Sequence, residues 1–171
     1  MVKHIMYKDS IYNNHYEEDY PVQVAENLFI NKNYYDTIFK AIANSELKNK
    51  GRYEYSDLGF ILLYKMIEDN TNGCFYDRLI TQFYAPLGAT TLGYLPLNRF
   101  PKERIVPTEN DIVFRRQLVH GHVHDPGAAM LGGICGHAGL FSNANDLAKL
   151  MQMYLEEGRY GGTEIFQPPN H

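Results

Sequence analysis

Residues 55–69 read YSDLGFILLYKMIED, a Tyr-Ser-Asp tripeptide placed directly before an apolar stretch. Ser56 and Asp57 are of the types that cap the free backbone N–H groups of a first helical turn, so we predict a helix over about Asp57 to Asn70. The positive end of that helix then lies close to the Tyr55 ring. A phenol at the mouth of a helix can serve as a proton shuttle, and Tyr55 is therefore the candidate catalytic residue, with Ser56 and Asp57 in support.

The ordinary pKa of tyrosine, about 10, makes it a poor base at neutral pH unless cations or hydrogen-bond donors stabilise its phenolate. A neighbouring lysine would be the natural helper. The alternative is that Tyr55 is an ordinary half-buried tyrosine, one of 14 in the chain, and that Ser-Asp is only a cap.

Three other segments carry apolar residues at helical spacing, which predicts helices over about Tyr34 to Lys48, Phe75 to Tyr84 and Asn145 to Glu157. The helices before residue 85 could pack together as an all-helical subdomain. Residues 1–31 show weak periodicity, so we expect them to be irregular. Prolines and glycines recur from Gly93 to Gly136, where we expect only short extended pieces such as Arg104 to Pro107.

Further sequence blocks follow the tripeptide in a fixed order: Pro86-Leu87-Gly88-Ala89, Val123-His124-Asp125-Pro126, Gly136-His137-Ala138-Gly139-Leu140-Phe141-Ser142 and Asp146-Leu147-Ala148. Together with residues 55–60 they resemble the middle portion of the serine hydrolase family of β-lactamases, penicillin-binding proteins and related esterases, most closely its class C-like branch. The resemblance runs from about Asn33 to Gly162. It implies an α+β, predominantly helical fold, with residues 1–171 forming a single, incomplete β-lactamase/DD-peptidase-like domain.

Members of this family carry a Ser-x-x-Lys nucleophile helix, a Tyr-x-Asn or Tyr-Ser-Asp turn, and a Lys-Thr-Gly or His-x-Gly strand. Tyr55 matches the tyrosine of the second signature. The Ser-x-x-Lys string at residues 45–48 lies at the end of a helical pattern and is followed by a glycine, as is typical of a helix C-terminus, so Ser45 is not expected to be the nucleophile. We expect the nucleophile helix before Met1 and the closing strand after His171, and the chain alone to be inactive.

The resemblance implies that a serine of the complete protein attacks an amide or ester carbonyl and forms an acyl-enzyme that water hydrolyses. Tyr55 and a lysine would share the proton transfers. The implied substrates are β-lactams, cell-wall peptides or small esters. The resemblance implies no cofactor, and it suggests a periplasmic or cell-envelope location.

Three more residues enter the candidate site. His137-Ala138-Gly139 fits His-x-Gly as a string, but the residues after it predict a helix, as in the mid-domain segment of the family. His137 is therefore either a site residue or one that orders its loop. We expect Asp125 to hold its own loop by accepting backbone N–H bonds, and His124 and Asp125 are candidates for contact with substrate.

The stretch His120-Gly121-His122-Val123-His124-Asp125 supports a rival hypothesis, a metal-dependent hydrolase. Alternating histidines of an extended segment project to one side and could bind zinc, whose water would then be the nucleophile. Binuclear zinc hydrolases carry His-x-His-x-Asp-His, but here the last two letters are reversed and no apolar strand precedes them, so we expect no metal. A third hypothesis is a non-catalytic binding or structural module that kept the fold.

The composition fits a folded globular piece, with 44% hydrophobic and 21% charged residues among 171. A net charge of −4 gives no basic surface for nucleic acid, no apolar run approaches the length of a membrane span, and residues 3–20 lack the apolar core of a signal peptide. We expect a small-molecule or peptide substrate, and possible self-association through surfaces exposed by truncation. Cys74 and Cys135 are expected to be free and buried.

Overall fold

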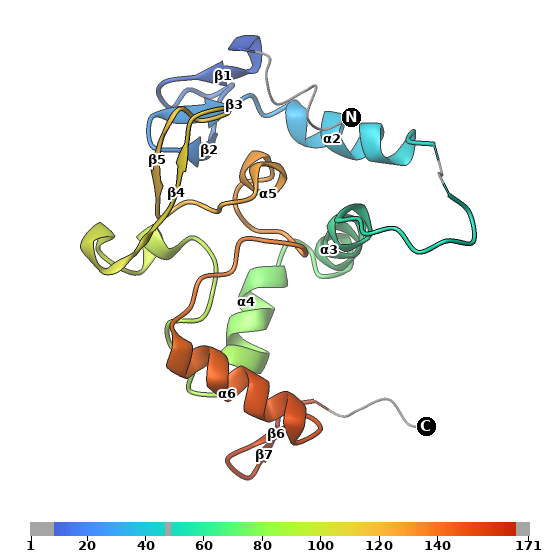
Figure 1. Cartoon of the computed structure of the whole chain (residues 1–171), viewed down its shortest axis with the longest axis vertical. Coiled ribbons are helices and arrows are strands. Elements are labelled where there is room, and N and C mark those ends of the chain that lie inside the picture. Colours follow the sequence, from blue (N-terminus) through green and yellow to red (C-terminus); the bar gives the residue numbers. More distant parts are fainter. Residues whose placement is uncertain (1–8, 47–48, 167–171) are drawn as a thin grey trace. The chain divides into compact units, whose positions relative to one another are not determined.

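The computed structural model describes residues 9–46 and 49–166, which divide into two compact units. The first unit holds the residues up to Tyr64 together with Leu95–Gly139, and the second holds Lys65–Tyr94 and the residues after Gly139. The division falls within helix α3 (Leu58–Asn70), which is labelled in Figure 1.

The first unit begins with a small antiparallel sheet whose strands lie in the order β1-β3-β2. Asn27 lies in the turn between β2 and β3 and has a φ of 55°, a left-handed conformation that asparagine tolerates better than most residues. Residues 1–31 were expected to be irregular, and for the described part this expectation is wrong. The elements are η1 (Asp9–Ile11), β1 (Tyr12–Asn13), β2 (Val22–Ala25) and β3 (Leu28–Ile30).

A second sheet of the first unit is a hairpin in which β4 pairs antiparallel with β5. The expected extended piece from Arg104 to Pro107 is not a strand, because Arg104 ends a 3-10 turn and Pro107 only opens β4. Helix α5 contacts β2. The elements are η3 (Pro96–Asn98), η4 (Lys102–Arg104), β4 (Pro107–Asp111), β5 (Gln117–His120) and α5 (Pro126–Met130).

Helix α2 (Tyr34–Ala43) belongs to the first unit and ends earlier than the sequence predicted. The Ser45 hydroxyl donates to the carbonyl oxygen of Ile42 at 2.7 Å, so Ser45 lies at the helix end, as expected. Lys48, the lysine of the Ser-x-x-Lys string, lies outside the described residues.

The second unit packs helices around a core formed by Tyr84, Leu87, Ala89, Leu92 and Met153. The predicted helix over Phe75 to Tyr84 is present as α4 (Phe75–Leu79) continued by a π-helical turn, η2 (Ile80–Tyr84). The predicted last helix is α6 (Ala144–Leu155), and a short hairpin, β6 (Arg159–Tyr160) and β7 (Thr163–Glu164), follows it.

The described structure mixes helices with short strands, and a helical majority is not confirmed, since helix accounts for 37%. Because α2 and α4 belong to different units, the expected all-helical subdomain is wrong. Cys135 is buried as expected, whereas Cys74 is exposed. Within the described ranges no helix has both the length and the apolar character needed to cross a membrane.

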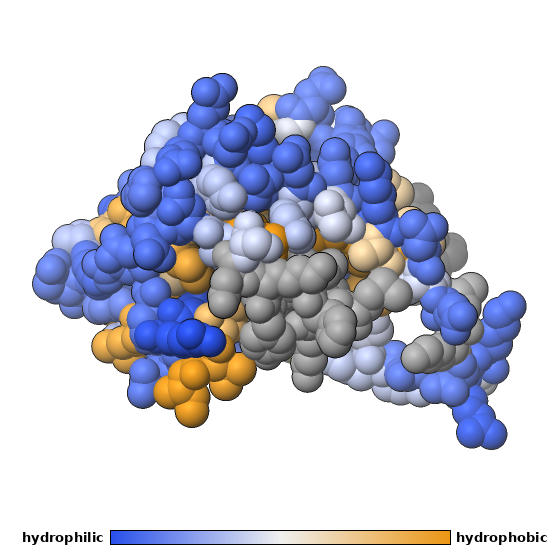
Figure 2. Space-filling view, turned by 90° about the horizontal axis from the view of Figure 1, so that it is seen from above, coloured by the Kyte–Doolittle hydropathy of each residue, from blue (hydrophilic) through white to orange (hydrophobic). Residues whose placement is uncertain are grey.

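Apolar side chains reach the surface among hydrophilic ones (Figure 2). Helix α3 also carries exposed apolar side chains. Ile61 and Tyr64 of this helix are buried, yet Phe60, Leu62 and Leu63 are about half exposed. A helix that is apolar on all sides is usually covered on all sides in a folded protein. The exposed side of α3 is therefore a surface that a further chain segment or a second molecule could cover.

Candidate functional site

The tripeptide at residues 55–57 forms the turn that opens α3. The carbonyl oxygen of Asp57 accepts the first helical hydrogen bond, from the N–H of Ile61 at 3.0 Å. The hydroxyl of Ser56 accepts from the N–H of Leu58 at 3.3 Å. Ser56 therefore caps the turn with its side chain, and the carboxylate of Asp57 stays available to other partners near the positive end of the helix.

Tyr55 is 79% exposed, and Asp57 is its hydrogen-bond partner. The Asp57 charge and this hydrogen bond raise the pKa of Tyr55 above its ordinary value. The sequence led us to expect a cation that would lower the Tyr55 pKa, but the described turn supplies a carboxylate instead. Tyr55 is therefore a neutral phenol at pH 7 that can donate a proton, rather than a phenolate base.

Asp125 holds its loop as predicted. Its Oδ1 accepts the N–H of Ala128 at 2.7 Å, which caps α5, and Pro126 occupies the first helical position, where a missing N–H does no harm. The ring of His137 approaches the same oxygen, with Nε2 at 2.8 Å. Burial opposes the Asp125 charge, but the hydrogen bonds from His137 and Ala128 outweigh it and lower the Asp125 pKa.

The chain brings Asp57, Asp125 and His137 together from three separate segments of the first unit. Their carboxylate oxygens and ring nitrogen all lie within 4.8 Å of one another. Gly136 helps to explain the approach, because a Cβ atom there would overlap the carbonyl oxygen of Phe60 in the first turn of α3. The glycine thus lets the segment that carries His137 pack directly against the helix that Asp57 opens.

Among the described residues, Asp57, Asp125 and His137 form the group of side chains that is best placed to bind a metal ion. Their own hydrogen bonding accounts for the cluster without one. His137 Nε2 contacts Asp125 Oδ1 at 2.8 Å, a separation typical of a hydrogen bond that stabilises opposite charges. The cluster is therefore best described as an Asp125–His137 ion pair with the Asp57 carboxylate close to it.

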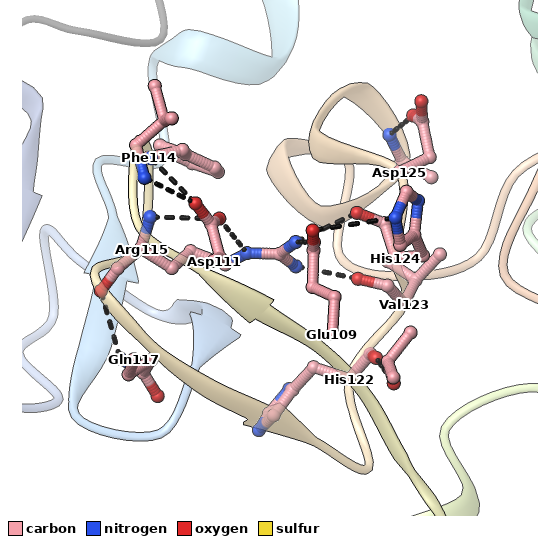
Figure 3. A network of polar contacts seen from close by, with 12 residues as sticks. Glu109, Asp111, Phe114, Arg115, Gln117, His122, Val123, His124 and Asp125 are labelled. Carbon is pink, nitrogen blue, oxygen red and sulfur yellow. Dashed lines mark hydrogen bonds and ion pairs between the residues drawn. The ribbon is translucent and has the colours of Figure 1, made fainter.

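A second polar network lies next to Asp125 in the chain and is centred on Arg115, whose side chain is fully buried. Figure 3 shows the guanidinium between Asp111 and Glu109, with the backbone of residues 123–124 on its far side. Arg115 forms ion pairs with both carboxylates, with Nε at 2.9 Å from Asp111, and donates to the carbonyl oxygens of Val123 and His124 at 2.6 and 2.8 Å. It therefore fixes the backbone that leads to Asp125.

Asp111 completes this network by accepting the backbone N–H groups of Val113, Phe114 and Arg115. Burial opposes its charge, but the Arg115 side chain and the three N–H bonds outweigh burial and lower the Asp111 pKa to about 2. Sequence reasoning missed this network. The sequence signal for this network was the four-residue spacing of Asp111 and Arg115, which allows an ion pair within one turn. Asp111 ends β4, and Arg115 lies in the turn before β5.

The histidine run does not bring its rings together as the rival metal hypothesis requires. His120 hydrogen-bonds the carbonyl oxygen of Ile105, His122 is half-buried with its pKa lowered by burial, and His124 is exposed at 3.4 Å from Glu109. Among residues 9–46 and 49–166, none of these three histidines belongs to a group whose ligand atoms could share an ion. His124 also lies outside the cluster of Asp57, Asp125 and His137.

Residues 7–168 match the family model described as Beta-lactamase. A putative D-alanyl-D-alanine carboxypeptidase of Escherichia coli (strain K12) is 37% identical to the chain over 134 residues, and one of Salmonella gallinarum (strain 287/91 / NCTC 13346) is 35% identical over 134 residues. Each match covers 71% of this chain and 31% of the relative, so the chain spans about a third of the length of these relatives. No solved structure matches the chain.

Proposed function

The chain belongs to the Beta-lactamase family, and from this premise we propose that the complete protein containing it is a serine hydrolase acting through an acyl-enzyme. In such a reaction a serine oxygen attacks an amide or ester carbonyl, the leaving amine or alcohol takes up a proton, and water then releases the acyl group. Residues 1–171 would contribute to a single domain of this kind, since the family match continues through both compact units.

The substrate that we propose first is a peptide ending in D-alanyl-D-alanine. The chain is similar to proteins named as putative carboxypeptidases for this dipeptide, and the shared region includes most of its length. β-Lactams and small esters are the alternative substrates, because they present a comparably reactive carbonyl to the same nucleophile.

The observation that carries the proposal is the hydrogen bond between Tyr55 and Asp57 at the opening of α3. Cleavage of a peptide bond produces an amine that must be protonated as it leaves. A neutral, exposed phenol can supply that proton and regain one from the base that deprotonates the attacking serine, and Asp57 orients the phenol by accepting its hydrogen bond. Tyr55 therefore acts as the general acid of acylation, and Ser56 fixes its turn.

Ser45 is not the nucleophile in this proposal. Its hydroxyl is occupied by the Ile42 carbonyl at the end of α2, whereas a nucleophile needs a base and oxyanion donors around it. The attacking serine then comes from another part of the complete protein. We accordingly expect no turnover of nitrocefin or p-nitrophenyl esters by the 171-residue chain alone, with or without Ser45→Ala.

Self-association is a further proposal, supported by the exposed apolar side of α3. Phe60, Leu62 and Leu63 would be covered by a second molecule when no other segment covers them. Size-exclusion chromatography with light scattering on the 171-residue chain tests this. A monomer at concentrations up to about 1 mM, the weak end of specific association, contradicts it.

The decisive experiment labels the complete protein with a fluorescent penicillin and locates the label by mass spectrometry. The proposal predicts one acylated serine, which is not Ser45, and release of D-alanine from a short peptide ending in D-alanyl-D-alanine. Labelling without release of D-alanine favours the alternative substrates. A folded protein that neither reacts with the label nor cleaves peptide or ester is a non-catalytic module.

A further inference from the structure

Helix α6 has two apolar sides, and the described structure covers only one of them. The inner side places Met153, which is 1% exposed, and the partly buried Leu150 in the core of the second unit. The other apolar side, which we call the outer face of α6, is open to solvent, and its large side chains are exposed by 44% at Leu147 to 79% at Leu155. The outer face consists of Ala144, Leu147, Ala148, Met151, Tyr154 and Leu155.

The residues of the outer face share one side of the helix. At about 100° of rotation per residue, they fall within an arc of about 120° around the helix axis. None of the charged or amide side chains among the 12 described residues of α6 lies in this arc, because Asn145, Lys149 and Gln152 share a third side and Asp146 is buried. An apolar stripe of about 100° or more is what a helix of a globular protein normally directs into a core. The outer face therefore has the composition of a buried side.

A second copy of the chain would bury too little area on the outer face to form a stable interface there. A helix of 12 residues is about 18 Å long and about 10 Å across. One side of it therefore offers less than the about 800 Å² that each partner of a stable protein–protein interface usually buries. A free partner also loses translational and rotational freedom on binding, whereas a segment of the same chain binds at a high effective concentration. The outer face is thus better matched to a covalently connected segment.

The length of the relatives indicates where such a segment comes from. The match to the Escherichia coli relative covers 31% of that protein, and the family match includes all of α6. We propose that the outer face of α6 is an internal interface of the complete protein, at which an apolar segment from outside residues 1–171 packs against Leu147, Met151 and Leu155. This inference goes beyond the proposed function, because it does not depend on the reaction that the complete protein catalyses.

The test labels three consecutive positions of α6 with a maleimide. Met151→Cys reports on the outer face, Gln152→Cys on the exposed polar side and Met153→Cys on the inner side. Each variant is made in a Cys74→Ser background, because Cys74 is exposed and would react as well. The labelling rate at each position is followed by mass spectrometry, both in the complete protein and in the 171-residue chain.

The inference predicts that Met151→Cys changes its behaviour between the two proteins. In the complete protein we expect it to react about tenfold or more slowly than Gln152→Cys, because a covered position reacts only when the structure opens locally. In the 171-residue chain it should react about as fast as Gln152→Cys, while Met153→Cys stays protected by the core. Leu147→Cys, one turn earlier on the outer face, repeats the measurement if Met151→Cys does not fold.

Three results would overturn the inference. The first is equal labelling of Met151→Cys and Gln152→Cys in the complete protein, which would leave the outer face uncovered. The second is protection of Met151→Cys in the 171-residue chain as well, which would place the cover within residues 1–171. The third is protection that disappears when the complete protein is diluted to a monomer, which would make a second copy the cover. Labelling needs no turnover, so failure of the proposed function would leave this test intact.

Discussion

Two polar clusters of the first unit differ in how completely their charges are satisfied. The Arg115 network buries a guanidinium between Asp111 and Glu109 and adds backbone partners on both sides. The cluster of Asp57, Asp125 and His137 is only partly buried, and it sets two carboxylates against one imidazole. The Arg115 network therefore acts as a structural clamp, and we call it the clamp below. The cluster of Asp57, Asp125 and His137 is a site whose protonation state can change.

The difference follows from the cost of burying charge. A buried ion that keeps all its hydrogen bonds is tolerated, whereas one that loses a partner is strongly destabilising. The Arg115 side chain meets this condition with four hydrogen bonds to carboxylates and carbonyl oxygens. Perturbed and incompletely balanced groups, in contrast, concentrate where proteins do chemistry.

We expect the largest loss of stability from a substitution in the clamp. Arg115→Met keeps much of the side-chain volume but leaves Asp111 and Glu109 without their cation, and we expect it to reduce the free energy of unfolding by about 3–5 kcal/mol. Urea unfolding of the complete protein measures this loss. Arg116→Met is the matched control, because Arg116 is exposed and should change stability by less than about 0.5 kcal/mol. Equal losses in the two variants would contradict the clamp.

Acid should weaken the clamp in a defined pH window. The Asp111 pKa is lowered from 3.8 to about 2, so its contribution is fully present above pH 3.8 and is lost as the pH falls through 2. The shift corresponds to about 2 kcal/mol. Unfolding of wild type and Asp111→Asn at pH 6 and pH 2 should show a stability difference that is smaller at pH 2. A difference that does not change with pH would count against this assignment.

The packing that builds the second cluster is tested by Gly136→Ala. The added methyl group would overlap the Phe60 carbonyl oxygen, so the segment carrying His137 must move away from α3. We expect a loss of about 1–3 kcal/mol in the free energy of unfolding. Gly59→Ala is the control, because nothing lies within 4 Å of a Cβ atom there. The same stability in both variants would show that the close approach is not required.

A pH-dependent stabilisation by His137 is also expected. Burial opposes the charge on its ring, but the hydrogen bond to Asp125 and the interaction with Cys135 outweigh burial and raise the His137 pKa from 6.5 to about 10. The stabilisation is therefore fully present below pH 6.5 and is lost as the pH rises through 10. The stability difference between wild type and His137→Gln should therefore shrink between pH 6 and pH 10. A difference that grows over this interval would mean that the ring is neutral in the folded protein.

Much of the helical framework could be predicted from the sequence. The helices α3, α4 with η2, and α6 have apolar residues at helical spacing and glycine, proline or asparagine at their ends. The strands of the first sheet were missed because elements of two to four residues are too short to show alternation. The division into two units was missed because it depends on contacts between segments far apart in the chain.

The candidate site was predicted residue by residue but not as a cluster. Tyr55 and Asp57 came from one block of the resemblance and Asp125 and His137 from two others. Nothing in their spacing shows that Asp57, Asp125 and His137 meet. Arg115 was missed, because its spacing from Asp111 is a weak signal and an arginine in a sequence is most often a solvated surface residue. Its burial depends on Glu109 and Asp111 of β4 and on the backbone that follows β5.

The most direct test of the account is the acylation rate of Tyr55→Phe in the complete protein, measured beside its melting temperature. The substitution removes the O–H that Asp57 orients and keeps the ring. We predict a fall in acylation of about 10²–10⁴-fold, the usual worth of general acid–base catalysis, with a melting temperature close to that of wild type because Tyr55 is exposed. Acylation at the wild-type rate in this variant would contradict the account.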